Sequence, residues 1–217
     1  MHNYYVVTLF PELIEPYLAH LPFKRALEKN LIQVRLVNLR DFAIDKRGTV
    51  DSPPYGSGPG MILRPEPLYN AVQSVAKGLT NNPRIIFLTP RGKTFNQQIA
   101  QEIAKAENMI LICGRYEGFD QRVVEELQAE ELSIGKYVLS GGEAAATVVL
   151  ECSIRLIPGA IDNAKALVNE SFNTANVEHP QYARPQTWRG RSVPKILTEG
   201  HHKKIASWKL SAKAWVE

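Results

Sequence analysis

Hydrophobic and polar residues follow two different rhythms along the first 160 positions of the chain. Short apolar runs bounded by turn residues are typical of buried strands, whereas apolar residues spaced three and four apart are typical of helices. The apolar runs predict strands at residues 4–10, 32–37, 85–88, 109–112 and 132–134. Helical spacing predicts helices at residues 21–29, 67–76, 94–104, 120–127 and 140–156. Strands that alternate with helices predict an α/β domain on a largely parallel sheet.

Two of the predicted helices begin with the spacing of a capping box, in which a hydroxyl and a side chain three residues later satisfy free backbone N–H groups. The pairs are Thr94 with Gln97 and Ser140 with Glu143. Residues 40–60 show no period and are rich in Gly, Pro and Asp, so they predict a long loop.

Three glycine-bearing loops follow the predicted strands, at residues 89–92, 113–118 and 135–143. Because ligands of parallel sheets bind beyond the carboxyl ends of the strands, we expect these loops to converge at one edge. Neither GxGxxG after a strand nor GxxxxGK[ST] is present, so the usual phosphate cradles are missing. A cofactor without phosphate, such as S-adenosylmethionine, is compatible with this pattern.

Composition excludes several classes of protein. Of 217 residues, 44% are hydrophobic and 22% charged, which is typical of a folded, water-soluble domain. The N-terminus lacks the pattern of a secretion signal, and no apolar run approaches the length of a membrane span. Two cysteines build no disulfide framework, so we expect a cytoplasmic protein with no membrane partner. No spacing of ligands predicts a metal site, and Mg²⁺ dependence is not readable from the sequence.

Charge is concentrated near the C-terminus. The whole chain carries a net charge of +4, while residues 181–213 alone hold eight basic residues against Glu199, a net +7. Tyr182, Trp188 and Trp208 are interleaved with these charges. The pattern suits a phosphate backbone with bases that stack on aromatic rings. A solvated helix face with Trp in a small core remains the alternative interpretation.

Several longer motifs occur in an order that is more specific than any one of them. They are Ile134-Gly135-Lys136-Tyr137-Val138-Leu139-Ser140-Gly141-Gly142-Glu143, Cys113-Gly114-Arg115-Tyr116-Glu117-Gly118, Thr49-Val50-Asp51 with Pro54-Tyr55-Gly56, and Pro180-Gln181-Tyr182-Ala183-Arg184-Pro185. Together they resemble the bacterial tRNA (guanine-N1)-methyltransferases over roughly residues 4–210.

The resemblance implies a fold, a domain organisation and an assembly. The fold is a SPOUT-type parallel sheet with a deep trefoil knot, plus a small helical C-terminal domain. The implied boundaries are residues 1–160 for the knotted cofactor-binding domain, 161–177 for a linker and 178–217 for a basic tRNA-binding domain shorter than usual. The implied assembly is a homodimer with the active sites at its interface.

The resemblance also implies an activity, the transfer of a methyl group from S-adenosyl-L-methionine to N1 of guanosine at tRNA position 37. Implied cofactor contacts are Leu88, Thr89, Pro90, Gly114, Tyr116, Glu117, Ile134, Gly135, Lys136, Tyr137, Val138, Leu139, Gly141 and Gly142. Implied tRNA contacts are Asp51 and Glu178, and the basic tail adds Arg184, Arg189 and Lys195.

Two catalytic residues are implied. Glu170 matches the family's general base, which is otherwise an Asp, and Arg155 matches an Arg proposed to assist at guanine O6. Glu is one methylene longer than Asp, and its reference pKa is about 0.4 unit higher, so it still accepts a proton. Two alternatives remain: a SPOUT methyltransferase acting on another RNA position, and a non-catalytic RNA-binding module.

Overall fold

The computed structural model describes the whole chain except residues 21, 163–166, 168–169, 173–175, 213 and 216–217. The chain divides into two compact units, Met1–Asp162 and Asn163–Glu217. Each unit is described by itself.

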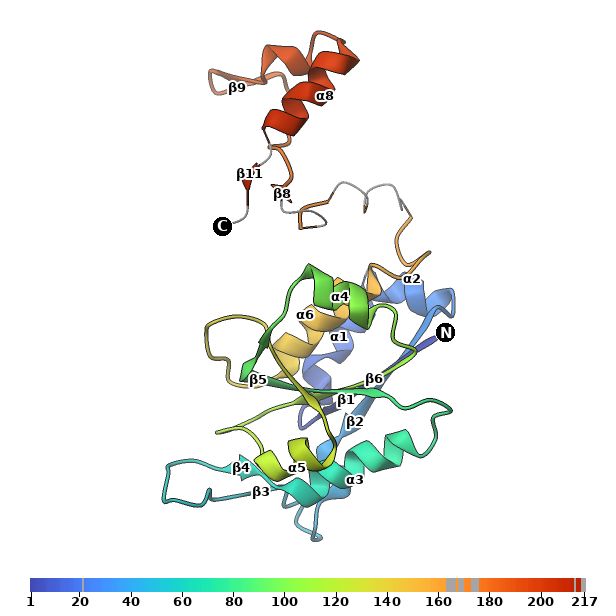
Figure 1. The fold of residues 1–217 in the computed structure, drawn as a ribbon, viewed down its shortest axis with the longest axis vertical. Helices are drawn as coiled ribbons and strands as arrows, with labels where there is room; N and C mark the ends of the chain where they lie inside the picture. Colours follow the sequence, from blue (N-terminus) through green and yellow to red (C-terminus); the bar gives the residue numbers. More distant parts are fainter. Residues whose placement is uncertain (21, 163–166, 168–169, 173–175, 213, 216–217) are drawn as a thin grey trace. The chain divides into compact units, whose positions relative to one another are not determined.

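A five-stranded sheet forms the centre of the first unit (Figure 1). Its strands lie in the order β2-β1-β6-β5-β7, and every neighbouring pair is parallel. The strands are β1 (His2–Thr8), β2 (Ile32–Asn38), β5 (Arg84–Thr94), β6 (Asn108–Cys113) and β7 (Glu130–Ser133). The prediction of an α/β domain on a parallel sheet is confirmed.

Helices cover both faces of the sheet (Figure 1). One face carries α1 (Glu15–Leu18), α2 (Phe23–Glu28), α4 (Gln97–Ile103) and α6 (Glu143–Ile154), and the other carries α3 (Pro65–Ala76) and α5 (Gln121–Glu126). Short 3₁₀ turns η1 (Pro11–Leu13) and η2 (Leu39–Phe42) follow β1 and β2. The result is a three-layer arrangement.

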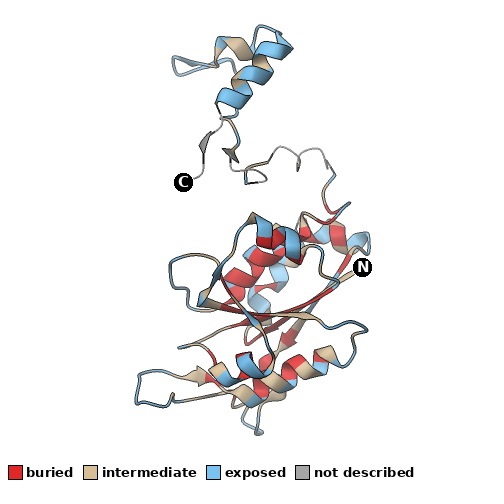
Figure 2. Ribbon diagram, in the orientation of Figure 1, coloured by how far each residue is buried: buried red, intermediate tan, exposed pale blue. Residues whose placement is uncertain are grey.

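The strands are buried on both sides, which explains their continuous apolar runs. Along β6, Met109 and Leu111 enter one core while Ile110 and Ile112 enter the other, because successive side chains point to opposite faces. All six residues of β6 are buried, and Figure 2 shows the same concentration of buried positions along the central strands.

Both predicted capping boxes are wrong. Helix α4 is capped by Asn96, whose side chain accepts a hydrogen bond from the backbone N–H of Ile99 at 3.0 Å. Residue Thr94 instead ends β5, where it pairs with β7. Helix α6 has Gly142 at its N-cap, and no side chain caps it. The carboxylate of Glu143 turns into the protein, where charged and hydroxyl partners hold it.

Strand β5 is longer than its apolar run predicts. It continues through Pro90 and Gly92 to Thr94, and both Leu88 and Lys93 lie opposite Leu132 of β7. Four residues therefore bulge out of the ladder at 89–92. Pro90 has no N–H to donate to a ladder, which favours such an irregularity.

The predicted 40–60 loop supplies the first strand and the tip of a small hairpin arm that ends beyond it. Its two strands are β3 (Asp51–Ser52) and β4 (Ile62–Leu63), which pair antiparallel. Tyr55 lies between them and is 99% exposed. The helix predicted at 21–29 begins at Phe23, and position 21 lies outside the described residues.

The second unit is built from short elements. They are β8 (Asn176–Val177), β9 (Thr187–Trp188), β10 (Arg191–Ser192), η3 (Lys195–Leu197), α8 (His202–Ser211) and β11 (Ala214–Trp215). Strands β9 and β10 form a hairpin, and β8 pairs with β11. No described helix in either unit is long and apolar enough to cross a membrane.

Candidate functional site

A pocket opens at the bulge of β5, where β6 and β7 end and α6 begins. Its wall is made by residues 88–90, 114–119, 132–135, 137–142 and Ala145, which overlap the three loops expected to converge. The carboxyl ends of three neighbouring parallel strands therefore meet at one site, as expected for a parallel sheet.

Thirteen of the fourteen expected cofactor contacts line this pocket. They are Leu88, Thr89, Pro90, Gly114, Tyr116, Glu117, Ile134, Gly135, Tyr137, Val138, Leu139, Gly141 and Gly142. Lys136 is the exception, since it is exposed and does not line the pocket.

Sequence reasoning missed seven residues that also line the pocket. They are Arg115, Gly118, Phe119, Leu132, Ser133, Ser140 and Ala145. Most of them lie inside or next to the quoted motifs. Their position beside expected contacts in the same loop could have identified them from the sequence. Phe119 adds an aromatic wall, and its ring packs edge-on against Phe87 with 4.6 Å between ring centres.

Two of the pocket loops approach each other closely at a glycine. The backbone N–H of Gly142 donates to the carbonyl of Gly114 at 2.8 Å. A Cβ on Gly142 would lie 2.7 Å from Cα of Cys113 and 2.9 Å from N of Gly114. Because these neighbours are backbone atoms, they cannot swing aside, and only glycine fits at position 142.

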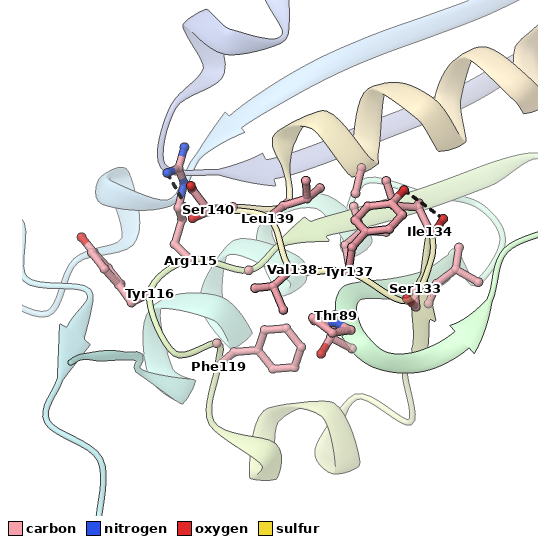
Figure 3. A pocket seen from close by; sticks show the side chains of 18 of the residues that line it. Thr89, Arg115, Tyr116, Phe119, Ser133, Ile134, Tyr137, Val138, Leu139 and Ser140 are labelled. Carbon is pink, nitrogen blue, oxygen red and sulfur yellow. Dashed lines mark hydrogen bonds between the residues drawn. The ribbon is translucent and has the colours of Figure 1, made fainter. Parts of the chain in front are cut away.

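The mouth of the pocket carries exposed apolar side chains. In Figure 3, Val138, Phe119 and Thr89 point toward one another across the mouth, while Tyr116 points away from it. Val138 is 82% exposed. Tyr116 has a φ of 58°, a left-handed conformation that non-glycine residues adopt mainly under a local constraint.

The hairpin arm is tied to the pocket by backbone hydrogen bonds. Glu117 N–H donates to the Met61 carbonyl at 2.9 Å, and Leu63 N–H donates to the Gly118 carbonyl at 2.9 Å. Asp51 pairs with Leu63 in this arm. The structure therefore brings the expected tRNA contact Asp51 next to the pocket loop.

Charged and thiol groups near the pocket have shifted pKa values. A hydrogen bond from the Arg122 side chain lowers the pKa of Asp120, which caps helix α5 by accepting from the Arg122 N–H. Burial raises the pKa of the Cys113 thiol well above its usual value. The thiol therefore stays protonated at neutral pH, which excludes it as a nucleophile.

Arg155 does not lie at this pocket. It follows the last residue of α6, whereas the pocket is at the first turn of the same helix. The 12 residues of α6 separate the two ends by roughly 18 Å at 1.5 Å per residue. Arg155 instead lines a small hollow together with Arg25. Arg25 forms an ion pair with Asp162, with 2.6 Å between Nη2 and Oδ2.

Glu170 and Glu178 both belong to the second unit. The Glu178 N–H donates to the Ser171 hydroxyl at 3.0 Å, so the chain folds back and brings the two segments together. Part of the linker between them lies outside the described residues.

The lysine and arginine residues that the structure describes in the second unit are exposed. Arg184 is exposed, and Lys195 begins η3. Arg189 lies in the turn of the β9–β10 hairpin, with its guanidinium 5.1 Å from the ring centre of Trp188.

The aromatic residues of the basic tail differ in burial and contacts. Trp208 packs with His179 and Tyr182, at 5.7 and 6.4 Å between ring centres, and this is a small aromatic cluster. Trp188 is 61% exposed and remains open to a partner. Among the described residues, no group of three or more His, Cys, Asp or Glu side chains is placed to hold a metal ion.

Comparison with known proteins decides the family. The family model described as tRNA (Guanine-1)-methyltransferase TrmD matches residues 2–215. The chain belongs to this tRNA (guanine-1)-methyltransferase family. It is 46% identical over 204 residues to the tRNA (guanine-N(1)-)-methyltransferase of Dehalococcoides mccartyi, covering 94% of this chain and 82% of that protein.

Two further members of the family support the assignment. The protein of the same name from Brevibacillus brevis is 46% identical over 207 residues, which cover 94% of this chain and 84% of that protein. The one from Bacillus cereus is 42% identical over 204 residues, with the same coverage.

The contact at Gly142 gives the first prediction. Gly142→Ala should lower the free energy of unfolding by about 1–3 kcal/mol, because the added methyl group overlaps fixed backbone atoms. Gly78→Ala is the control, since a Cβ there meets its nearest neighbour at an ordinary 3.7 Å. Urea denaturation of both variants measures the difference. Equal stability of the two variants would contradict the described geometry.

Proposed function

We propose that this chain transfers a methyl group from S-adenosyl-L-methionine to N1 of the guanosine at tRNA position 37. One observation carries the proposal: two of the family's motifs, at residues 113–118 and 134–143, come together with residues 88–90 around one pocket of the first unit. The named relatives act as tRNA (guanine-N(1)-)-methyltransferases, and they match 94% of this chain.

The pocket suits a cofactor without phosphate. Its loops bring backbone N–H and C=O groups close together through Gly114, Gly141 and Gly142, and such groups read the edge of an adenine ring. Phe119, Leu132 and Val138 provide apolar surface for the ring itself. Among the described residues that line the pocket, Glu117 alone carries a carboxylate, and it matches the positive charge of a sulfonium or ammonium group.

The reaction needs a base, because guanine N1 carries a proton at neutral pH. When bound, S-adenosylmethionine supplies an electrophilic methyl group on its sulfonium sulfur. The carboxylate of Glu170 accepts the N1 proton, and the guanidinium of Arg155 stabilises negative charge that develops on guanine O6. The walls of the pocket orient the methyl group toward N1, so positioning supplies a large part of the rate.

The place of Arg155 favours a homodimer with shared active sites. Because α6 separates Arg155 from the pocket of its own chain, the Arg155 that completes a pocket comes from a second copy. The exposed side chains Tyr137, Val138 and Leu139 at the pocket mouth, and Val148 on α6, are apolar surface that such a partner would cover.

The course of β5 supports a knotted chain. Residues Leu88 and Lys93 both lie opposite Leu132, so the chain between them leaves the ladder beside β7. A Cβ on Gly92 would collide with the backbone of Leu132, so the two segments pass very close to each other. The threading of one segment through a loop, which makes the knot itself, is proposed from the family resemblance.

The second unit is proposed to hold tRNA. Arg184, Arg189 and Lys195 attract the phosphate backbone, and Trp188 presents an exposed ring on which an unpaired base stacks. Asp51 and Glu178 are proposed to contact the same tRNA beside the target nucleotide.

Labelled methyl transfer to two tRNA transcripts tests the function. One transcript carries guanosine at positions 36 and 37, and the other carries adenosine at 37. We expect label on the first transcript alone. Label on both would move the target to another RNA position, and label on neither would contradict the proposed activity.

The role of Glu170 gives a separate prediction. Glu170→Gln keeps the size of the side chain but cannot take a proton, so turnover should fall by about 10²–10⁴-fold while cofactor binding is unchanged. Single-turnover rates and cofactor titration measure the two effects. Glu170→Asp serves as the control and should retain activity. Turnover of the Gln variant near the wild-type rate would remove Glu170 from the mechanism.

Shared active sites predict complementation between two inactive variants. Arg155→Ala leaves the pocket intact, and Gly141→Trp blocks the pocket but keeps Arg155. Dimers formed from an equal mixture should recover about a quarter of the wild-type activity, because half of them are mixed and each of those has one complete site. Activity no higher than that of the separate variants would show that Arg155 does not act across the interface.

A further inference from the structure

A closed ring of four residues includes Arg115, which lines the pocket. The Thr8 hydroxyl donates to Glu143 Oε1 at 2.7 Å, and Arg115 Nε lies 3.2 Å from Glu143 Oε2. The Arg115 guanidinium sits 4.4 Å from the ring centre of Phe10. The Phe10 N–H donates to the Thr8 hydroxyl at 3.0 Å and completes the ring.

The carboxylate in this ring is buried. Glu143 is 3% exposed, and it is the first residue of α6, where the helix dipole favours a negative charge. A buried carboxylate is costly unless it is paired and hydrogen-bonded. Here Arg115 supplies the charge and Thr8 the hydrogen bond, so the cost is offset. Because buried ion pairs add little net stability, the main consequence of this pair is the geometry that it fixes.

Arg115 connects this ring to both glycine loops of the pocket. It belongs to the 113–118 loop, and its Nη1 donates to the Ser140 carbonyl in the 134–142 loop at 3.3 Å (Figure 3). Its backbone forms a bridge with Gly141. The side chain of Arg115 therefore spans the two loops, and Glu143 determines where that side chain lies.

Glycine at position 141 leaves the room that this arrangement needs. A Cβ on Gly141 would collide with Nε of Arg115 and crowd the carboxylate of Glu143. In the Ser140-Gly141-Gly142-Glu143 sequence, Gly141 leaves room for the Arg115 side chain and Gly142 for the backbone of the 113–118 loop. The carboxylate that binds Arg115 follows directly. Contrary to the prediction from its spacing, Glu143 does not cap its helix; its carboxylate binds Thr8 and Arg115 inside the protein instead.

We propose that Glu143 is a positioning residue for cofactor binding: its carboxylate holds Arg115 across the two loops and so sets the shape of the pocket. This inference rests on the proposed function, in which the pocket binds S-adenosylmethionine. Glu143 does not line the pocket, so it acts on the cofactor through Arg115 and the loops.

Calorimetric titration of the full chain with S-adenosylmethionine tests the proposal. Glu143→Gln keeps the shape but removes the charge, and we expect the cofactor Kd to rise about ten-fold or more, the scale of a lost charge-assisted hydrogen bond. The KM for the cofactor should rise equally, while kcat at saturating cofactor should stay near the wild-type value. Arg115→Lys keeps the charge but loses the planar fork, and it should weaken binding as well.

An ion pair at the other end of the same sheet provides the control; its arginine is buried to the same degree, whereas the side chain of its glutamate is 50% exposed against 4% for that of Glu143. Arg84 binds Glu130 at 2.7 and 2.8 Å, and its side chain is 21% exposed, against 20% for Arg115. Glu130→Gln should leave the cofactor Kd within about two-fold of wild type, as for a change away from the site. Equal weakening by Glu130→Gln and Glu143→Gln would overturn the proposal.

The outcomes separate this inference from the function on which it rests. Wild-type protein that binds no cofactor would overturn the proposed function itself. Binding by wild type and Glu143→Gln with equal Kd would overturn only the role of Glu143. Should Glu143→Gln not fold, Arg115→Lys decides, and a wild-type Kd there would overturn the proposal. The double variant Glu143→Gln/Arg115→Ala should lose less binding free energy than the two single variants lose together, because both residues act through one contact.

Discussion

The site depends on the close contact of two backbones. The 113–118 and 134–142 loops touch through the hydrogen bond between Gly142 and Gly114, and a Cβ on Gly142 would overlap the backbone of Cys113 and Gly114. This contact brings the end of β6 against the start of α6, and the pocket is the space that remains beside it. The ion pair between Arg115 and Glu143 holds the same two loops together. The backbone hydrogen bond and the ion pair therefore both determine how far apart these loops lie.

Most of the fold could be predicted from the sequence because the strands are buried on both faces. Such strands are continuous apolar runs, and β6 is found within one residue of its run at either end. The failures lie where local spacing has two physical explanations. Ser140 and Glu143 have the spacing of a capping box, but a buried hydroxyl and guanidinium compete for the carboxylate and hold it. Pro90 and Gly92 indicate the end of a strand, whereas pairing with β7 resumes beyond them.

The residues of each pocket loop could be predicted from the sequence. The sequence does not show that one chain lacks Arg155 at its own pocket. Thirteen of the fourteen expected cofactor contacts meet at one pocket because parallel strands end at one edge of the sheet, and Lys136 does not line it. Sequence spacing does not reveal that Arg155 lies a full helix away from this pocket. That separation follows only from the direction of α6, and it is the physical reason for expecting a second copy of the chain at each site.

Hydrogen exchange with and without S-adenosylhomocysteine tests the location of the cofactor most directly, since exchange reports protection segment by segment. The account predicts slower exchange in residues 88–94, 113–118 and 134–142, with no change in α3 on the opposite face of the sheet. Protection confined to the hollow near Arg25 and Arg155, or no protection in the three pocket segments, would contradict it.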